Sequence, residues 1–266
     1  MEIIILGRTI KLKVHDESEL TSNLLRYGSV DTDMFSAYEE ILKEGDTYLD
    51  IGANMGVNAI FGSLLVGNTG TVYAFEPEEK NYNLLLENIA LNNIKNIIPI
   101  NAAVSDETSV AQLFKSTTNF GDHRVNQIMI STDDHSESVE IVCITLDQFI
   151  EEYNVDPTKI SLIKSDTQGS EVRVLHGGKK FFNVYEPAVI LEFAPHHLQW
   201  AGYSPFDILS FIDRMKYTAC SMSYFKKLQH NCSVLTPLTY GDLFNSTVHC
   251  MTNGTHTDFC LIRHEI

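Results

Sequence analysis

The chain has 266 residues, of which 44% are hydrophobic and 20% charged, so it can fill one sizeable core and is not globally disordered. The formal net charge of −16 disfavours binding to nucleic acid or to an anionic membrane. No run approaches the roughly 20 apolar residues of a membrane span, and five scattered cysteines without a Cys-x-x-Cys pair are typical of reduced thiols. We therefore expect a cytoplasmic protein with no nucleic-acid partner and no membrane span, and the oligomeric state stays open.

The N-terminal part of the chain predicts a lead in front of the main domain. Residues 2–14 contain two β-rich runs around a glycine, which indicates a hairpin. From residue 18 to 43 the apolar spacing becomes helical and Gly28 divides it, so we expect two helices joined by a turn at 28–33. We interpret residues 1–45 as a hairpin and helical cap, and residues 46–266 as a Rossmann-like domain.

Short strands then alternate with amphipathic helices, which is the rhythm of a parallel, doubly wound α/β sheet. The expected strands cover residues 47–51, 71–75, 97–100, 162–164 and 188–192. The expected helices cover residues 57–66, 80–92 and 171–182. Two polar stretches, near 106–140 and 229–256, interrupt the rhythm, and we interpret them as insertions into one domain.

The first of these strands ends in an acid-led, glycine-rich turn, Asp50-Ile-Gly-Ala-Asn-Met-Gly56. Glycine lets the backbone take unusual dihedral angles and lie against a ligand, and the helix that follows offers free N–H groups. A dinucleotide-binding turn has no acid before its first glycine. Asp50 would repel a pyrophosphate but could bind an ammonium group, so the pattern favours a ligand with an amino-acid head. The candidate contacts in this turn are Asp50, Gly52, Ala53, Asn54 and Gly56.

Glu76 ends the second strand, 26 positions after Asp50. An acid in that place normally accepts hydrogen bonds from two ribose hydroxyls. A ribose together with a charged amino-acid end describes S-adenosylmethionine, which we predict as the cofactor. Small residues after the third strand leave room for a flat ring. The further predicted cofactor contacts are Pro77, Asn101, Ala102 and Ala103.

Asp166 ends the fourth strand and so points into the crevice where open α/β sheets bind substrates. We expect it to contact both cofactor and acceptor, whereas Glu171 is better explained as a helix-start residue. The other candidate catalytic residues are Glu192, His196 and His197, because an unperturbed imidazole suits a general base at neutral pH. A metal site of Asp166, Glu192 and a histidine has no recognisable ligand spacing, so no metal is predicted.

In this order the residues resemble the FkbM family of S-adenosylmethionine-dependent methyltransferases. The matching pieces are 50–56, 72–77, 101–106, 145–147, 163–171 and 190–192. The resemblance implies a class I Rossmann-like fold with a mostly parallel, seven-stranded sheet, and methyl transfer to an oxygen of a sugar or natural product. The family often has D-x-E-G after the fourth strand. Gln168 replaces that glutamate here, so no carboxylate is available at this position as a base or metal ligand.

The function expected from this sequence is O-methylation of a hydroxyl on a sugar, nucleotide-linked sugar or related small molecule, with surface-polysaccharide (capsule) tailoring as a role. A sulfonium methyl is already activated, so the protein mainly aligns the acceptor and excludes water. Two alternatives stay open, a catalytically inactive cofactor-binding module and a nicotinamide-dependent oxidoreductase. His123 could contact the acceptor, but a solvated loop residue is the favoured interpretation, and Trp200 is either a stacking surface for the acceptor or a core residue.

Overall fold

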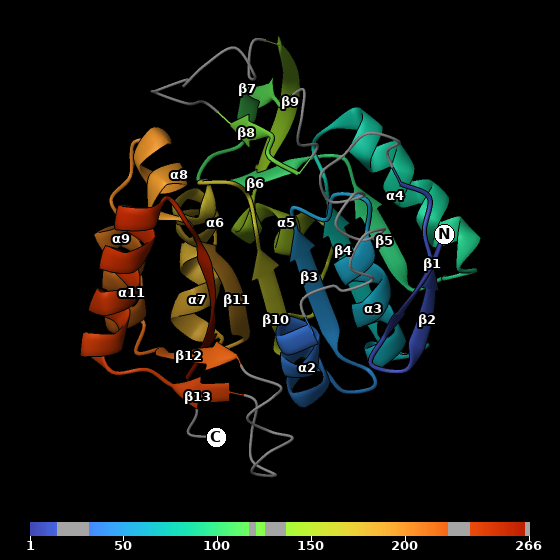
Figure 1. The fold of residues 1–266 in the computed structure, drawn as a ribbon. Coiled ribbons are helices and arrows are strands. Elements are labelled where there is room, and N and C mark those ends of the chain that lie inside the picture. The colour runs from blue at the N-terminus through green and yellow to red at the C-terminus, as the bar shows by residue number, and fades with distance from the viewer. Residues whose placement is uncertain (15–31, 117–120, 126–136, 223–234, 264–266) are drawn as a thin grey trace.

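The computed structural model describes residues 1–14, 32–116, 121–125, 137–222 and 235–263. Its centre is a sheet with the strand order β13-β12-β14-β11-β10-β3-β4-β5 (Figure 1). The five strands from β11 to β5 are parallel, and β14, β12 and β13 continue the sheet antiparallel. The strand bounds are β3 Thr47–Ile51, β4 Thr71–Phe75, β5 Ile97–Ile100, β10 Ile160–Ser165, β11 Ala188–Phe193, β12 Thr218–Met222, β13 Leu235–Pro237 and β14 Thr257–Ile262.

The described part of this sheet has eight strands, so the expected count of seven is not confirmed. The additional strand is β13, which lies at the edge of the sheet and pairs with β12 through Thr236 opposite Ser221. A strand of three residues inside a polar stretch has no alternating pattern that the sequence could reveal. The expectation of a mostly parallel, doubly wound α/β fold is confirmed.

Helices cover both faces of the sheet because successive side chains of a strand point to opposite sides. Tyr48 belongs to one apolar core and Leu49 to the other. The first core packs against α2 Thr32–Ile41, α3 Val57–Val66 and α4 Glu79–Leu91. The second packs against α5 Leu146–Glu152, α6 Glu171–Gly177, α7 Lys179–Val184, α8 Pro195–Trp200, α9 Pro205–Arg214 and α11 Tyr240–Asn253.

The helix expected at 171–182 is divided into α6 and α7 at Gly178. A Cβ atom at Gly177 would lie 2.0 Å from the carbonyl oxygen of Ser105, so the chain passes close to a neighbouring backbone here. Only glycine permits this approach, and the helix is interrupted at that point.

The N-terminal hairpin is formed by β1 Glu2–Ile5 and β2 Arg8–Lys11, as the sequence predicts. Its buried isoleucines pack into the core beside α3. The second expected helix is α2, while the first lies outside the described residues. The division into residues 1–45 and 46–266 stays a prediction.

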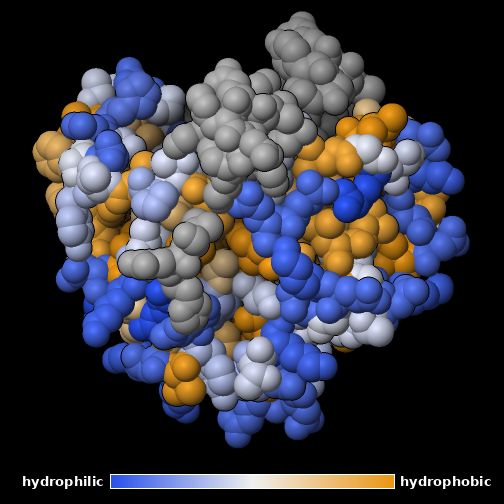
Figure 2. All heavy atoms as spheres, turned by 90° about the horizontal axis from the view of Figure 1, so that it is seen from below, coloured by the Kyte–Doolittle hydropathy of each residue, from blue (hydrophilic) through white to orange (hydrophobic). Residues whose placement is uncertain are grey.

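The first insertion builds a second sheet above the carboxyl ends of the parallel strands (Figure 1). Its order is β6-β9-β7-β8, with β6 Ala103–Ser105, β7 Ser109–Lys115, β8 Arg124–Val125 and β9 Glu137–Thr145. The second insertion supplies β13 and α11. Figure 2 shows the opposite face, at the amino ends of the strands, where hydrophilic residues surround smaller hydrophobic areas. None of the described helices is long and apolar enough to cross a membrane.

Candidate active site

The glycine-rich turn after β3 is fixed against both neighbouring strands. Gly52, Asn54 and Gly56 have positive φ angles of 80°, 50° and 91°. A Cβ atom at position 52 would lie 2.0 Å from the carbonyl oxygen of Asp166, so the turn passes directly beside the end of β10. On the other side the backbone N–H groups of Gly52 and Ala53 donate to the carbonyl of Phe75. The turn therefore lies where three strand ends meet.

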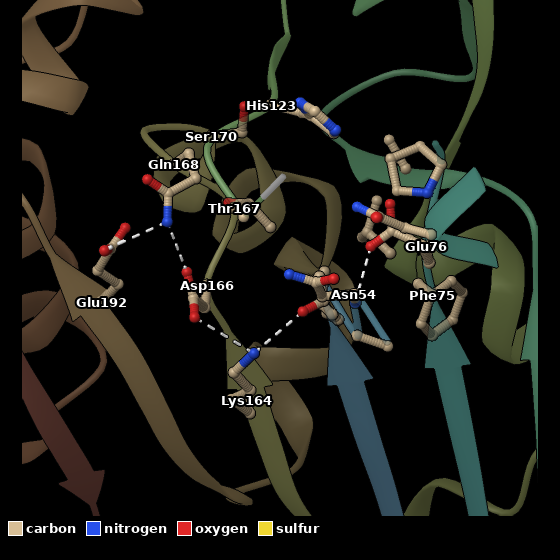
Figure 3. Close-up of a pocket in the computed structure, with 18 of the residues that line it drawn as sticks. Asn54, Phe75, Glu76, His123, Lys164, Asp166, Thr167, Gln168, Ser170 and Glu192 are labelled. Carbon is tan, nitrogen blue, oxygen red and sulfur yellow. Dashed lines mark hydrogen bonds and ion pairs between the residues drawn. The ribbon is translucent and has the colours of Figure 1, made fainter. Parts of the chain in front are cut away.

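Glu76 lies directly after β4 and faces this turn (Figure 3). Its Oε2 accepts a hydrogen bond from the N–H of Asn54 at 2.8 Å, and its Oε1 accepts one from the N–H of Glu78 at 2.9 Å. Burial raises the pKa of Glu76 to about 7 despite these hydrogen bonds. Each carboxylate oxygen can accept a second hydrogen bond. Glu76 can therefore hold the turn and still bind hydroxyl groups of a ligand.

Asp50 lies beneath the turn, is fully buried and does not line the cavity. The ammonium of Lys164, on β10, lies 3.5 Å from Asp50 Oδ1 and 3.4 Å from Asp166 Oδ2, and donates to the carbonyl of Gly52 at 3.1 Å. Burial alone would lower the pKa of Lys164, but the carboxylates of Asp166 and Asp50 hold it above its usual value. The sequence predicts that Asp50 binds the ammonium group of a ligand. In the structure the ammonium group beside Asp50 is that of Lys164.

Asp166 and Glu192 lie together and share one amide (Figure 3). The side-chain nitrogen of Gln168 donates to Asp166 Oδ1 at 3.0 Å and to Glu192 Oε1 at 3.4 Å. Burial, together with the charge of Asp166, raises the pKa of Glu192. Glu171 accepts hydrogen bonds from the N–H groups of Thr167 and Gly169, so it fixes the loop that carries Gln168.

His197, on α8, lies behind Glu192. Its Nδ1 is 3.7 Å from Glu192 Oε2, and its Nε2 is 3.4 Å from Nη2 of Arg124, on β8. Burial and the nearby Arg124 charge lower the pKa of His197 to about 4, so the imidazole is neutral at pH 7. The same guanidinium lies 4.3 Å from the ring centre of Trp200 and pairs with Asp122. These contacts join the inserted sheet to α8.

These groups surround a cavity of about 720 Å³, a volume typical of small-ligand sites. The predicted site residues that line it are Gly52, Ala53, Asn54, Glu76, Pro77, Ala102, Ala103, Asp166 and Glu192. The predicted residues that do not line it are Asp50, Gly56, Asn101, His196 and His197. Asn101 instead donates to the carbonyl of Glu76, and His196 lines a second cavity of about 260 Å³ with His197, Trp200 and His256.

Sequence reasoning assigned no definite role in the site to several residues that line the cavity. Lys164 interrupts a buried strand, and a lysine among apolar residues beside an aspartate was the available signal. His123 lines the cavity too, where a solvated loop position was expected. Asn58 has no such signal, because it lies in the first turn of α3 without a distinctive pattern.

The polar groups fit the predicted cofactor. The side-chain oxygens of Asn54 and Asn58 are buried without a hydrogen-bond partner among the described residues, and both residues line the cavity. An unpaired buried acceptor costs free energy unless a donor reaches it. The ammonium and hydroxyl groups of S-adenosylmethionine are such donors, and Ala102 and Ala103 leave space for its ring.

A model of the methyltransferase FkbM domain family matches residues 50–219. Over 57 residues the chain is 47% identical to a protein of Saccharolobus solfataricus that is, by name, a cobalt-precorrin-6B C(15)-methyltransferase (decarboxylating). That alignment covers 20% of this chain and 29% of the relative.

Two solved structures match parts of this chain. A methyltransferase FkbM from Methylobacillus flagellatus KT is 16% identical, with a TM-score of 0.44, over 77% of this chain and 51% of that one. Aeropyrum pernix fibrillarin with bound S-adenosyl-L-methionine is 14% identical, with a TM-score of 0.43, over 92% of this chain and 74% of that one. The chain thus spans about a third of the curated relative and about half of the FkbM structure.

The sheet order, the turn after β3 and the acid after β4 define a class I methyltransferase fold. The chain belongs to the FkbM methyltransferase family, as the sequence predicts. Its predicted cofactor, S-adenosylmethionine, is confirmed with the family.

Proposed function

We propose that the protein is an S-adenosylmethionine-dependent O-methyltransferase that acts on a hydroxyl of a sugar, nucleotide-linked sugar or related small molecule. The observation that carries this proposal is that Glu76 and Asn54 line the same cavity as the carboxylates of Asp166 and Glu192. One end suits the donor and the other suits a hydroxyl acceptor. We include the tailoring of surface polysaccharide, and a cytoplasmic location, in the same proposal.

Binding of the cofactor is assigned to the turn and to Glu76. When bound, S-adenosylmethionine supplies a methyl group that is activated by a positively charged sulfur. Glu76 would accept hydrogen bonds from the ribose hydroxyls, and Asn54 and Asn58 would receive the amino-acid end with their unpaired oxygens. Asp50 acts indirectly in this scheme, because its charge balances Lys164, which in turn holds the carbonyl of Gly52.

The acceptor end is assigned to Asp166 and Glu192. Burial and the charge of Asp166 raise the pKa of Glu192, which makes its carboxylate a stronger proton acceptor than that of an exposed glutamate. His197 supports Glu192 from behind rather than facing the cavity, and His196 lies at the second cavity. Inserted residues such as Leu113 and Val125 provide apolar walls that exclude water from the reaction.

Calorimetry tests the cofactor half of the proposal. Glu76→Ala should lose most of the affinity for S-adenosylmethionine, because it removes the acceptor for the ribose hydroxyls. Glu79→Ala, an exposed carboxylate in the first turn of α4, is the matched control and should bind normally. Unchanged binding by Glu76→Ala would contradict the assignment.

A screen with a labelled methyl donor tests the reaction itself. Methyl transfer to sugars or related polyols would support the proposal. Cofactor binding without transfer to any acceptor would favour an inactive binding module, and transfer to carbon or to RNA would refute the proposed acceptor. Thermal protection by NAD rather than by S-adenosylmethionine would favour the oxidoreductase.

A further inference from the structure

The acceptor end of the cavity has an unusual balance of charge. Among the described residues, Lys164 is the only lysine or arginine that lines the cavity. Its ammonium already contacts Asp50, Asp166 and the carbonyl of Gly52. Arg124 lies nearby, but its guanidinium is bound by both oxygens of Asp122. The carboxylates of Asp166 and Glu192 therefore have no unengaged lysine or arginine beside them in the described structure.

One carboxylate oxygen at this end also lacks a partner. Glu192 is 6% exposed, and its Oε2 has no hydrogen bond among the described residues. Nδ1 of His197 is 3.7 Å away and too distant for a hydrogen bond. Because Glu192 lines the cavity, a donor carried by the acceptor can reach this carboxyl group.

The sequence flanking β8 adds no lysine or arginine. Positions 117–120 and 126–136 contain neither lysine nor arginine, and the second segment includes Asp133 and Asp134. The whole chain has a net charge of −16, so the long-range field also disfavours an anion. A phosphate or carboxylate on the acceptor would meet repulsion that no unengaged lysine or arginine of the described residues compensates at this end of the cavity.

We propose that the acceptor carries a protonated amine beside its reacting hydroxyl, and that Glu192 and Asp166 bind this amine. This inference rests on the proposed methyltransferase function and narrows its substrate class to amino sugars and related amino alcohols. Gln168 holds the two carboxylates together from one side, and Oε2 of Glu192 has no hydrogen bond of its own among the described residues. A nucleotide-linked acceptor would have to keep its phosphates outside this end of the cavity.

The test compares three probes of similar ring shape and different charge. Glucosamine, glucose and glucuronate are titrated into the protein saturated with S-adenosylhomocysteine, and binding is measured by calorimetry and thermal shift. We expect glucosamine to bind about tenfold more tightly than glucose, and glucuronate to bind most weakly. Equal or tighter binding of glucuronate, or no glucosamine binding at millimolar concentration, would overturn the inference.

Glu192→Gln tests the assigned residue, because it removes the charge while keeping the size of the side chain. It should reduce the preference for glucosamine over glucose about tenfold. Glu140→Gln removes the same charge from an exposed position on β9 and should leave the preference unchanged. An unchanged preference in Glu192→Gln would also overturn the inference.

Binding of S-adenosylhomocysteine by each variant shows that it is folded. A protein that binds S-adenosylhomocysteine but prefers glucuronate refutes only this inference. A protein that binds no S-adenosylhomocysteine refutes the proposed function itself.

Discussion

Two individual residues set the shape and charge of the cofactor end, and each does so through the backbone. Gly52 permits the contact between β3 and the end of β10, because no side chain fits against the carbonyl of Asp166. Glu76 accepts two backbone N–H groups, one of them from the glycine-rich turn. A carboxylate buried in this way holds the turn, and burial makes its ionisation costly.

Gly52→Ala should destabilise the protein much more than Gly7→Ala. Both glycines have φ near 80°, so both alanines pay a left-handed backbone cost of about 1–2 kcal/mol. Only position 52 adds a clash with a neighbouring backbone, and we expect a total above about 3 kcal/mol. Urea unfolding measures both variants, and equal losses would show that the close approach to β10 is unimportant.

Glu76→Gln should change how stability depends on pH. The folded pKa of Glu76 is raised from 4.5 to about 7, so its protonated form favours the folded state. This contribution is complete below pH 4.5 and is lost as the pH rises through about 7, on the order of 3 kcal/mol. Relative to the native protein, the variant should therefore gain stability between pH 5 and pH 8. If chemical unfolding gives the native protein and Glu76→Gln the same dependence of unfolding free energy on pH, the pKa of Glu76 is not raised.

At the scale of elements, the active site is completed by a contact between β8 and α8. Arg124, from a strand of two residues, reaches Trp200 and His197 on the other side of the cavity. A guanidinium always donates, so Nε2 of His197 must accept and the proton of the neutral ring lies on Nδ1, facing Glu192. The inserted sheet thereby sets the orientation of a side chain behind the acceptor site.

Arg124→Met should raise the pKa of His197 by about one unit, because it removes a nearby positive charge. Nitrogen NMR of His197 measures the pKa, and in the native protein it should show the proton on Nδ1. Arg173→Met is the control, since Arg173 stacks on Tyr203 and pairs with Asp106 instead. If Nε2 of His197 carries the proton in the native protein, or if the pKa of His197 is unchanged in Arg124→Met, then Arg124 does not set the protonation of this ring.

At the scale of the whole molecule, the N-terminal lead is joined to the cofactor site through one buried asparagine. Asn88, on α4, donates to the carbonyls of Lys13 and Met55 and accepts from the N–H of Lys13. It therefore links the hairpin, helix α4 and the glycine-rich turn. The lead and the Rossmann-like core share an apolar cluster around α3, which adds to this connection.

Asn88→Ala should lower the free energy of unfolding by about 2–4 kcal/mol, because it leaves the buried carbonyl of Met55 and two partly buried backbone groups of Lys13 without their partner. Asn92→Ala is the matched control, since Asn92 makes the same kind of contacts to Lys11 at an exposed site. Its loss should be at most about 1 kcal/mol. Similar losses for the two variants in thermal unfolding would refute the importance of burial here.

The order of strands and helices in the parallel part of the fold followed from local patterns. The strands at 47–51, 71–75 and 97–100 and the helix at 57–66 have the predicted bounds. Apolar runs and glycine-rich turns are local properties, so a single sequence reveals them. The inserted strands and β13 were not predicted, because they are polar or short and depend on pairing with distant partners.

The sequence by itself determined the family, the cofactor and the set of acids at the carboxyl edge, since their spacing along strands fixes which strand ends they occupy. Only the tertiary structure decided how those acids are used. It brought Lys164 to Asp50, Gln168 between Asp166 and Glu192, and Arg124 to His197. Charge compensation and burial depend on residues that are far apart in the chain, and no local pattern records which of them meet.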